Sequence, residues 1–219
     1  MPSNVKNYLW LNPIVEKMIE KDRDSVILLL TAKGYTVVQC TSGAAKTYEA
    51  YVKYIKGVKV KPVIDARCPL VASLIKQKYP SLAAHLAPIA PILSACTEDL
   101  YNKYVEPFPE KASLTVIAPC TALADDGQAR FGSRVRFVTW KQFSKEIDDL
   151  LMYPPLSISP VPPGFFRDFG EMVLESSGAR GIDNLLEAAC QGKLSPSVYL
   201  LEMLYCENGC HKGDGVTVA

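Results

Sequence analysis

The sequence predicts an α/β fold that is divided into two small lobes. Helix signals alternate along the chain with short runs of aliphatic and β-branched residues, which is the pattern of α/β proteins. The chain has 219 residues, enough for one domain or for two small lobes. Five prolines between residues 154 and 163 predict a connector, which we expect to cross between the lobes.

Capping and proline signals predict the helices. Pro13 and Pro69 each fall in the first turn of a helix, where a backbone N–H has no intrahelical partner to lose. Asp24 or Ser25 caps a further helix that Gly34 ends, although its central apolar run is equally compatible with a buried strand. The expected helices span residues 13–21, 25–33, 44–55, 69–78, 97–104, 140–151 and 179–190.

Short apolar runs between turn residues predict the strands. Pro88 and Pro91 predict an irregular segment, and Asp125 and Asp126, next to Gly127, indicate a loop. The expected strands span residues 35–39, 62–65, 114–118, 135–139 and 198–203.

Domain boundaries and composition limit the class of protein. We expect residues 1–24 to form an N-terminal extension, a candidate docking segment, and residues 25–219 to form the two-lobed domain. A net charge of +1 argues against a broad basic face for nucleic acid. No apolar run reaches 18 residues and the N-terminus lacks a signal-peptide layout, so we expect a cytoplasmic protein without a membrane span.

Seven cysteines are the unusual feature of the composition. An odd number without a secretion signal argues against a disulfide framework. In a reducing compartment, cysteines act as small apolar core residues, metal ligands or redox groups. Composition alone does not distinguish these roles, so the positions of the cysteines along the chain are considered next.

Four of the cysteines follow predicted strands. Cys68 lies between a strand and the helix that Pro69 begins, Cys120 follows the strand over residues 114–118, and Cys206 and Cys210 follow the last strand. In open α/β sheets, ligands gather at the carboxyl ends of the strands. These four thiols, which come from three loops, could therefore converge on one metal centre.

The other cysteines and the histidines have simpler interpretations. Cys96 and Cys190 lie near helix ends, where packing is the expected role. Cys40 also ends a strand, so packing is favoured there without excluding a ligand. His85 and His211 are expected to be structural, with His211 as an alternative ligand.

Spacing favours an iron–sulfur centre over zinc by a modest margin. Zinc sites usually draw ligands from close CxxC pairs, whereas the close pair here is the CxxxC of Cys206 and Cys210. Iron–sulfur clusters also take four thiolates, and a cuboidal cluster accommodates ligands from distant loops.

Three short motifs resemble the signatures of the [FeFe]-hydrogenase catalytic domain. Residues 65–69 (Asp-Ala-Arg-Cys-Pro), followed by Lys78-Tyr79-Pro80, resemble the first signature. Residues 118–122 (Ala-Pro-Cys-Thr-Ala) resemble the second, and residues 202–210 (Glu-Met-Leu-Tyr-Cys-Glu-Asn-Gly-Cys) resemble the third. Each motif is weak alone, but their order and spacing match the family over most of the chain.

This resemblance implies two α/β lobes with an iron–sulfur site in the cleft between them. It implies that Cys68, Cys120, Cys206 and Cys210 hold a [4Fe–4S] cluster. In the family, the last of these cysteines also bridges to a diiron subcluster where hydrogen is made. The chain is shorter than a usual family catalytic domain, so we expect trimmed lobes.

The departures from the family concern the diiron subcluster. The proton-donor cysteine of the family is Arg67 here, and the lysine that binds a diatomic ligand is Leu123. The flanking methionines fall at Ala118 and Leu204, and a serine of the proton path falls at Ala87. The resemblance therefore implies a [4Fe–4S] cluster, with the diiron subcluster not expected.

These residues together predict an iron–sulfur electron-transfer protein or subunit. Arg67, beside Cys68, is expected to lie near the cofactor and to raise its potential through its positive charge. A ferredoxin- or flavin-containing redox partner is expected, because no second cluster motif is present to pass electrons onward. The alternatives are a redox or gas sensor domain with the same cluster, a minimal [FeFe] hydrogenase, and a zinc-binding or metal-free relic.

Overall fold

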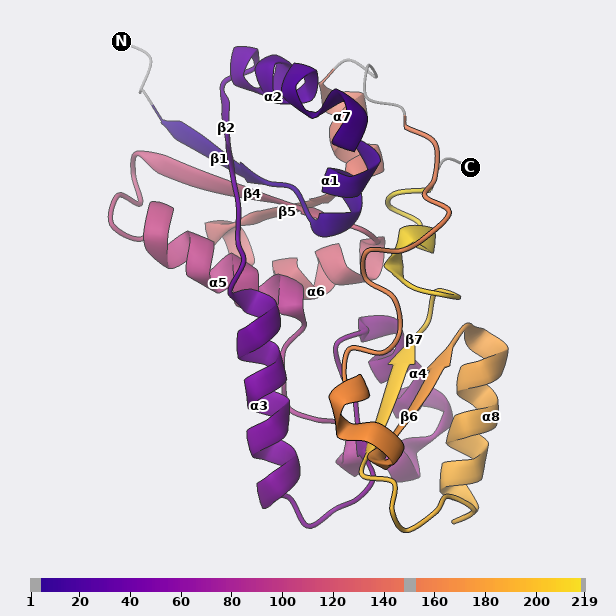
Figure 1. The fold of residues 1–219 in the computed structure, drawn as a ribbon. Helices are drawn as coiled ribbons and strands as arrows, with labels where there is room; N and C mark the ends of the chain where they lie inside the picture. Colours follow the sequence, from indigo (N-terminus) through magenta and orange to yellow (C-terminus); the bar gives the residue numbers. More distant parts are fainter. Residues whose placement is uncertain (1–4, 148–152, 218–219) are drawn as a thin grey trace.

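Two parallel β-sheets divide the chain into two lobes, which are stacked one above the other in Figure 1. The computed structural model describes residues 5–147 and 153–217. The upper sheet has the strand order β2-β1-β4-β5 and the lower sheet has the order β3-β7-β6, with every pairing parallel. The expected α/β fold class is confirmed.

The elements alternate along the sequence. The strands are β1 Lys6–Trp10, β2 Tyr35–Val38, β3 Val63–Ile64, β4 Ala112–Ala118, β5 Arg136–Thr139, β6 Val173–Ser177 and β7 Leu200–Leu204. The helices are α1 Pro13–Met18, α2 Arg23–Ala32, α3 Gly43–Gly57, α4 Pro69–Lys78, α5 Ile92–Tyr104, α6 Thr121–Phe131, α7 Trp140–Glu146 and α8 Ala179–Cys190. Among the described residues, no helix combines the length and the hydropathy that crossing a membrane requires.

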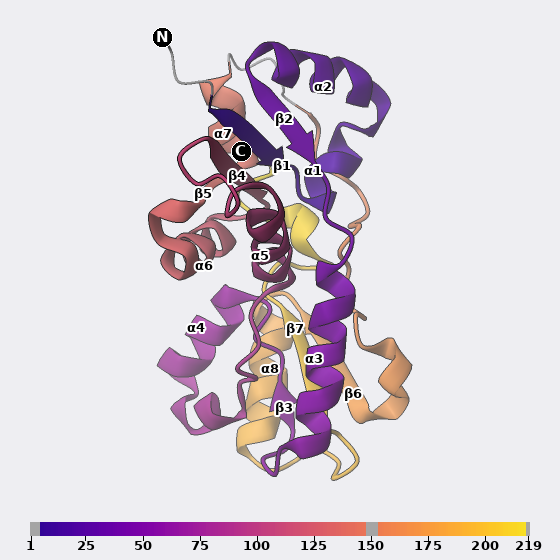
Figure 2. The same cartoon turned by 90° about the vertical axis from the view of Figure 1, so that its left-hand side faces the viewer.

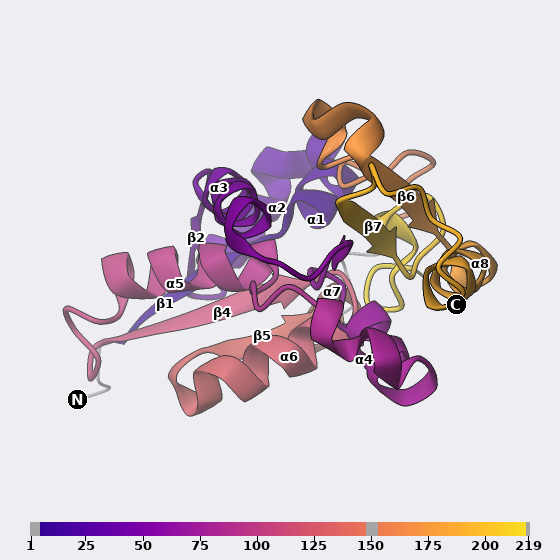
Figure 3. The same ribbon diagram turned by 90° about the horizontal axis from the view of Figure 1, so that it is seen from below.

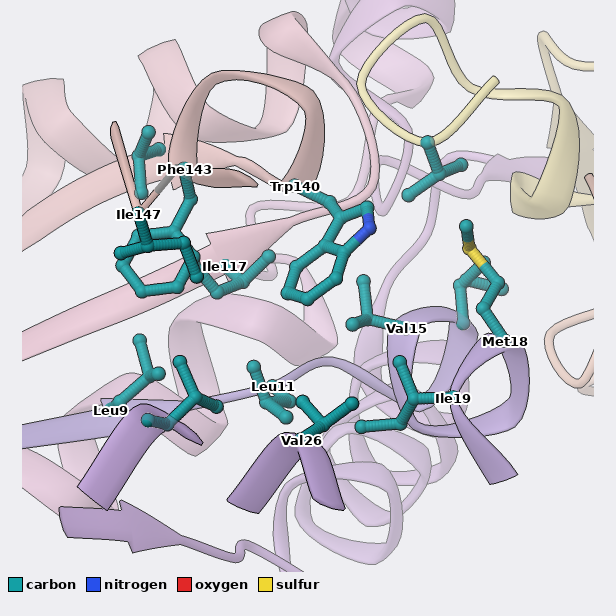
Figure 4. Packing of buried hydrophobic residues seen from close by; sticks show 14 residues of the cluster. Leu9, Leu11, Val15, Met18, Ile19, Val26, Ile117, Trp140, Phe143 and Ile147 are labelled. Carbon is teal, nitrogen blue, oxygen red and sulfur yellow. The ribbon is translucent and has the colours of Figure 1, made fainter. Parts of the chain in front are cut away.

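Helices cover both faces of the upper sheet. Helices α1, α2 and α7 pack on one face, where Leu9, Ile117 and Phe143 are fully buried (Figure 4). Helices α5 and α6 pack on the other face, where Leu100 of α5 meets Val116 of β4. A parallel sheet covered on both faces buries its strands on both sides, and every residue of β4 except Ser113 is buried.

The lower sheet is covered in the same way. Helices α4 and α8 pack on one face through Ile75 and Leu186, and α3 packs on the other face through Tyr51. Phe166, from the chain that precedes β6, is fully buried on the face that α3 covers. Figure 3 shows α3 and α4 on different sides of this lobe.

The chain passes between the lobes several times, as Figures 1 and 2 show. It leaves the upper lobe after β2, returns before α5, descends again through residues 153–163 and rises after β7. Along the third crossing, Tyr153 and Leu156 pack against the upper core, and Phe165 packs against the lower core. The loops after β3, β4 and β7 consequently lie between the two lobes.

The expected N-terminal extension is instead part of the upper lobe. Residues 6–10 form β1, which pairs with β2 on one side and with β4 on the other. Helix α1 follows directly, because the side chain of Asn12 accepts hydrogen bonds from the backbone N–H groups of Ile14 and Val15. The expectation of an extension ahead of the domain is wrong for these residues.

The expected loop at residues 125–127 is instead the middle of helix α6. Asp126 forms an ion pair with Arg130 one turn later, at a nitrogen–oxygen distance of 2.6 Å. Gly127 lies against the ring of Phe137 in β5, where an added β-carbon would overlap the ring. This glycine therefore serves close packing of the helix on the sheet and does not mark a turn.

Two helix boundaries and one strand also differ from those expected. Helix α5 begins at Ile92, directly after Pro91, and therefore starts earlier than residue 97. Strand β6 was not expected, because its residues are half-exposed or exposed and end in two serines. The helix expected over residues 140–151 is α7, which ends at Glu146, and residues 148–151 lie outside the described part of the chain.

Candidate metal centre

The carboxyl ends of three strands bring four cysteines together between the lobes. Cys68 follows β3 and is the N-cap residue of α4, and Cys120 follows β4 and is the N-cap residue of α6. Cys206 and Cys210 lie in the loop after β7. All four thiols line one cavity with about 370 Å³ of empty volume, together with Arg67, Leu70, Leu123, Leu204, Tyr205 and Gly213.

The loop between Cys206 and Cys210 depends on a left-handed turn. Asn208 has a φ of 61° and Gly209 has a φ of 118°, a region in which glycine is favoured. A β-carbon on Gly209 would lie 2.5 Å from the backbone oxygen of Val161, in the connector between the lobes. The turn therefore presents both cysteines on the same side and packs closely against the connector.

The segment after Cys210 is fastened to the turn that carries Cys120. The carboxylate of Asp214 accepts a hydrogen bond of 2.8 Å from the backbone N–H of Thr121, at the start of α6. Gly213 packs on the backbone of Pro119 so closely that an added β-carbon would overlap its carbonyl oxygen. Two of the cysteine loops are thereby held at a fixed separation.

Burial and mutual repulsion keep these thiols protonated when no cation is bound. Burial raises the pKa of Cys206 to about 11 and that of Cys120 to about 12, and repulsion from Cys68 adds to both shifts. The pKa values of Cys68 and Cys210 are also raised, chiefly by burial. Because a thiolate is the ligand form, this set of thiols needs a strongly positive centre to ionise it.

Four thiols around one cavity are the donor set that a cubane cluster takes. Within the described ranges, no group of three or more His, Cys, Asp or Glu side chains forms a site for a single metal ion. A cubane cluster spreads its four thiolate ligands around several irons, so the ligands surround a volume. Four thiols around one cavity fit that arrangement, and the backbone N–H groups of Tyr205 and Leu123 partly offset the raised pKa values of Cys68 and Cys120.

Arg67 lies beside this cavity, but its positive charge is already paired. Its Nε and Nη2 atoms donate to the carboxylate of Asp65 at 2.7–3.0 Å, and Nη2 also donates to Glu202 at 2.9 Å. Asp65 and Glu202 are fully buried, and Asp65 accepts a further hydrogen bond from Tyr51. The three charged groups carry a net charge of −1, so the positive charge expected at Arg67 is offset by two carboxylates.

Glu202 also organises the chain that enters the lower lobe. Its carboxylate accepts backbone hydrogen bonds from Gly164, Phe165 and Phe166 at 3.0–3.1 Å. The guanidinium of Arg67 stacks on the rings of Phe165 and Phe166, at 4.1 and 4.7 Å from the ring centroids. The sequence does carry a signal for this role, because a lone acid inside the apolar strand β7 must find a buried partner.

A second cavity adjoins the first. It has about 810 Å³ of empty volume and an almost entirely apolar lining, and Arg67, Leu123, Leu204 and Cys210 line both cavities. Three of the residues that the family resemblance aligns with positions around the diiron subcluster, Arg67, Leu123 and Leu204, therefore line this second cavity. Cys40 and Cys96 also line this second cavity.

The other singled-out residues fall in three different environments. Cys96 is buried in the upper core, as expected, whereas Cys190 is exposed at the end of α8 and not packed. His85 hydrogen-bonds to the backbone of Pro62, in agreement with a structural role. His211 is buried next to Cys210, and its Nδ1 atom has no hydrogen-bond partner among the described residues.

Comparisons with known proteins connect this geometry to one fold. No known family and no curated protein matches the sequence. The apo form of a variant of [FeFe]-hydrogenase HydA1 from Chlamydomonas reinhardtii is 12% identical, with a TM-score of 0.66 over 100% of this chain and 81% of that chain. A second variant of the same enzyme is 13% identical, with a TM-score of 0.67 over 100% of this chain and 82% of that chain.

A structure of HydA(deltaEFG) that reveals stepwise H-cluster assembly in an [FeFe]-hydrogenase matches equally well. It is 14% identical, with a TM-score of 0.65 over 100% of this chain and 81% of that chain. At such identities the likeness concerns the backbone arrangement. The protein therefore has a hydrogenase-like fold.

Proposed function

We propose that the protein binds one [4Fe–4S] cluster and acts as an iron–sulfur electron-transfer protein, or as such a subunit of an oxidoreductase complex. The observation that carries this proposal is the cavity lined by Cys68, Cys120, Cys206 and Cys210. All of its metal-binding donors among the described residues are thiols, as four-thiolate clusters require. The hydrogenase-like fold supports the proposal, because the matching structures are [FeFe]-hydrogenases.

The chain supplies the ligands and the surroundings, and the bound cluster would supply one-electron exchange. The two helix N-caps, Cys68 and Cys120, present their thiols next to backbone N–H groups, which stabilise the thiolate form. The loop of Cys206 and Cys210, which follows β7 of the lower sheet, supplies the other two thiols of the cavity. Apolar neighbours such as Leu70 limit the access of water to the site.

The buried charges beside the cavity favour a low reduction potential. Asp65, Arg67 and Glu202 together carry a net charge of −1, and Arg67 lines the cavity. Adding an electron near a buried negative charge is unfavourable, so this group stabilises the oxidised form of a bound cluster.

Hydrogen turnover is not part of the proposed function. The second cavity presents Leu123 and Leu204 where the family resemblance expects a lysine and a methionine. Arg67 stands in place of the proton-donor cysteine, and its guanidinium stays protonated at any working pH. A positioned acid is commonly worth about 10²–10⁴ in rate, so its absence is a large loss.

Electron transfer requires a partner. A ferredoxin- or flavin-containing protein in the cytoplasm is the proposed partner, because the sequence carries no second cluster motif through which electrons could leave. Reduction of the reconstituted protein by such a partner, followed through the cluster absorbance, would identify the direction of transfer.

Anaerobic purification or reconstitution tests the cluster directly. We expect about four iron and four sulfide per chain, with an EPR signal after reduction. Changing Cys68, Cys120, Cys206 or Cys210 to Ser should lower cluster occupancy, and Cys190→Ser is the matched control that should leave it unchanged. One equivalent of zinc without iron would contradict the proposal.

A further inference from the structure

Two cysteines outside the cluster set, Cys40 and Cys96, line the second cavity. Cys40 follows β2 and is half-buried, and Cys96 lies on α5 and is 4% exposed. Both side chains line the cavity and pack in the same cluster of the upper lobe, and each thiol shifts the pKa of the other. They are thus a pair of sulfur groups, and not two isolated cysteines.

A glycine allows the segment that carries Cys40 to approach Cys96. Gly43, the first residue of α3, lies so close to Cys96 that an added β-carbon would overlap the sulfur atom. The same β-carbon would lie 3.0 Å from the backbone nitrogen of Cys96 and 3.2 Å from the backbone oxygen of Ile92. The start of α3 therefore meets α5 at backbone contact, which brings the loop with Cys40 next to Cys96.

The two thiols differ in accessibility and in acidity. Burial opposes ionisation of Cys40, but hydrogen bonds to its sulfur from Ser42, from Cys96 and from the backbone of Gly43 outweigh it and lower its pKa. Burial raises the pKa of Cys96 well above the ordinary value for cysteine. A half-buried thiol with a lowered pKa, close to a buried thiol, is the arrangement of an attacking and a resolving cysteine.

We propose that Cys40 and Cys96 form a redox-active dithiol that exchanges two electrons with small disulfides such as glutathione disulfide. The Cys40 thiolate attacks one sulfur of the small disulfide, which forms a mixed disulfide and releases the first small thiolate to take up a proton. The Cys96 sulfur, on losing its proton, attacks the Cys40 sulfur and releases the second small thiol. Two protein thiols are oxidised and one small disulfide is reduced to two thiols.

This dithiol does not depend on a bound cluster. Neither thiol belongs to the four cysteines of the first cavity, and Cys40 and Cys96 join β2 to α5 within the upper lobe. The reaction can therefore be tested in cluster-free protein, and its outcome is separate from that of the cluster experiments.

The test is a thiol–disulfide titration of the full chain. Cluster-free, reduced protein is equilibrated anaerobically with glutathione and glutathione disulfide, quenched in acid, alkylated and digested with trypsin. Trypsin releases Cys40 in residues 34–46 and Cys96 in residues 79–103, each as the only cysteine of its peptide. We expect a disulfide that links these two peptides. The peptide that contains Cys190 should instead be recovered in alkylated form or with glutathione attached.

Three variants make the assignment specific. Cys96→Ser should accumulate glutathione on Cys40, because the resolving thiol is missing, whereas Cys68→Ser should still form the linked pair. Gly43→Ala keeps both thiols but separates them, and should slow the linkage at least about tenfold if it folds. Circular dichroism monitors folding, and the Cys96→Ser result decides the question if Gly43→Ala is unfolded.

The proposal is overturned by either of two results. One is the absence of the linked pair at every glutathione ratio in protein with native circular dichroism. The other is a Cys96→Ser variant in which Cys40 gains no more glutathione than it does in the unchanged protein.

Discussion

Arg67 and Glu202 meet across 135 residues of sequence, with Nη2 of the arginine 2.9 Å from Oε1 of the glutamate. The contact joins the loop after β3 to strand β7, next to the cavity of four thiols. Because Asp65 holds the same guanidinium, one buried cation serves two buried carboxylates. Removing the cation would leave both carboxylates without a counter-charge.

Arg67→Met is therefore expected to destabilise the protein strongly. Breaking a buried ion pair from one side costs about 3–5 kcal/mol, because uncompensated charges stay buried. Urea unfolding measures the free energy. The matched control is Arg136→Met, which removes a half-exposed pair with Glu146 and should cost about 1 kcal/mol or less. Equal losses in the two variants would contradict the assignment.

Glu202→Gln is expected to raise the reduction potential of the reconstituted cluster. The substitution removes one negative charge from the group at Arg67 and leaves it neutral, so reduction becomes less unfavourable by an amount on the order of tens of millivolts. Redox titration followed by EPR measures the midpoint. A shift to lower potential, or none at low salt, would show that this charge does not act on the cluster.

Gly213→Ala is expected to loosen the cysteine loops. The added β-carbon would overlap the carbonyl of Pro119, and such overpacking costs about 1–3 kcal/mol. A lower Tm, by roughly 2–10 °C, and lower cluster occupancy should appear together. Gly57→Ala is the matched control, because nothing lies within 4 Å of its added β-carbon and its melting temperature should not fall.

Alkylation should distinguish Cys96 from Cys190 in reduced, cluster-free protein. An ordinary cysteine has a pKa of about 8.5 and is therefore partly ionised at pH 8. Burial raises the pKa of Cys96, so its thiol stays protonated at that pH. We expect Cys190, which is exposed, to react with iodoacetamide well before Cys96 at pH 8. Similar rates for the two peptides would mean that Cys96 is accessible.

The protein should neither evolve nor oxidise hydrogen, even when supplied with the machinery that builds a diiron centre. Arg67 cannot release a proton, and Leu123 offers no hydrogen bond to a second metal unit. The substitution Arg67→Cys alone should not produce activity, because binding of the diiron unit and delivery of the proton are lost separately. Hydrogen uptake above the cluster-free control, or infrared bands of iron-bound carbon monoxide and cyanide, would refute this prediction.

The positions of the four cysteines in the fold could be predicted from the sequence, because each depends on local signals. Cys68 and Cys120 follow short apolar strands and precede helices, and Pro69 marks one of those helix starts. The loop of Cys206 and Cys210 follows the last apolar run. Such strand–turn–helix patterns need no knowledge of distant residues.

The buried ion group and two of the strands could not be predicted in this way. The pairing of Arg67 with Glu202 could not be predicted, because the two residues are distant in sequence and only the fold brings them together. Strand β1 starts with Lys6 and Asn7, and only its last two residues are buried, so its pattern does not resemble a core strand. Its place in the sheet comes from pairing with β4, more than 100 residues later.

The repeated passage of the chain between the lobes governs the order in which the protein can be assembled during synthesis. The upper sheet cannot close until β4 has emerged to pair with β1, and the lower sheet waits for β6 and β7. Long-range pairing of this kind is slow and leaves unpaired strand edges exposed meanwhile. The pocket of four thiols is complete only after residue 210 has left the ribosome, so a shorter nascent chain could not offer the proposed cluster its full set of ligands.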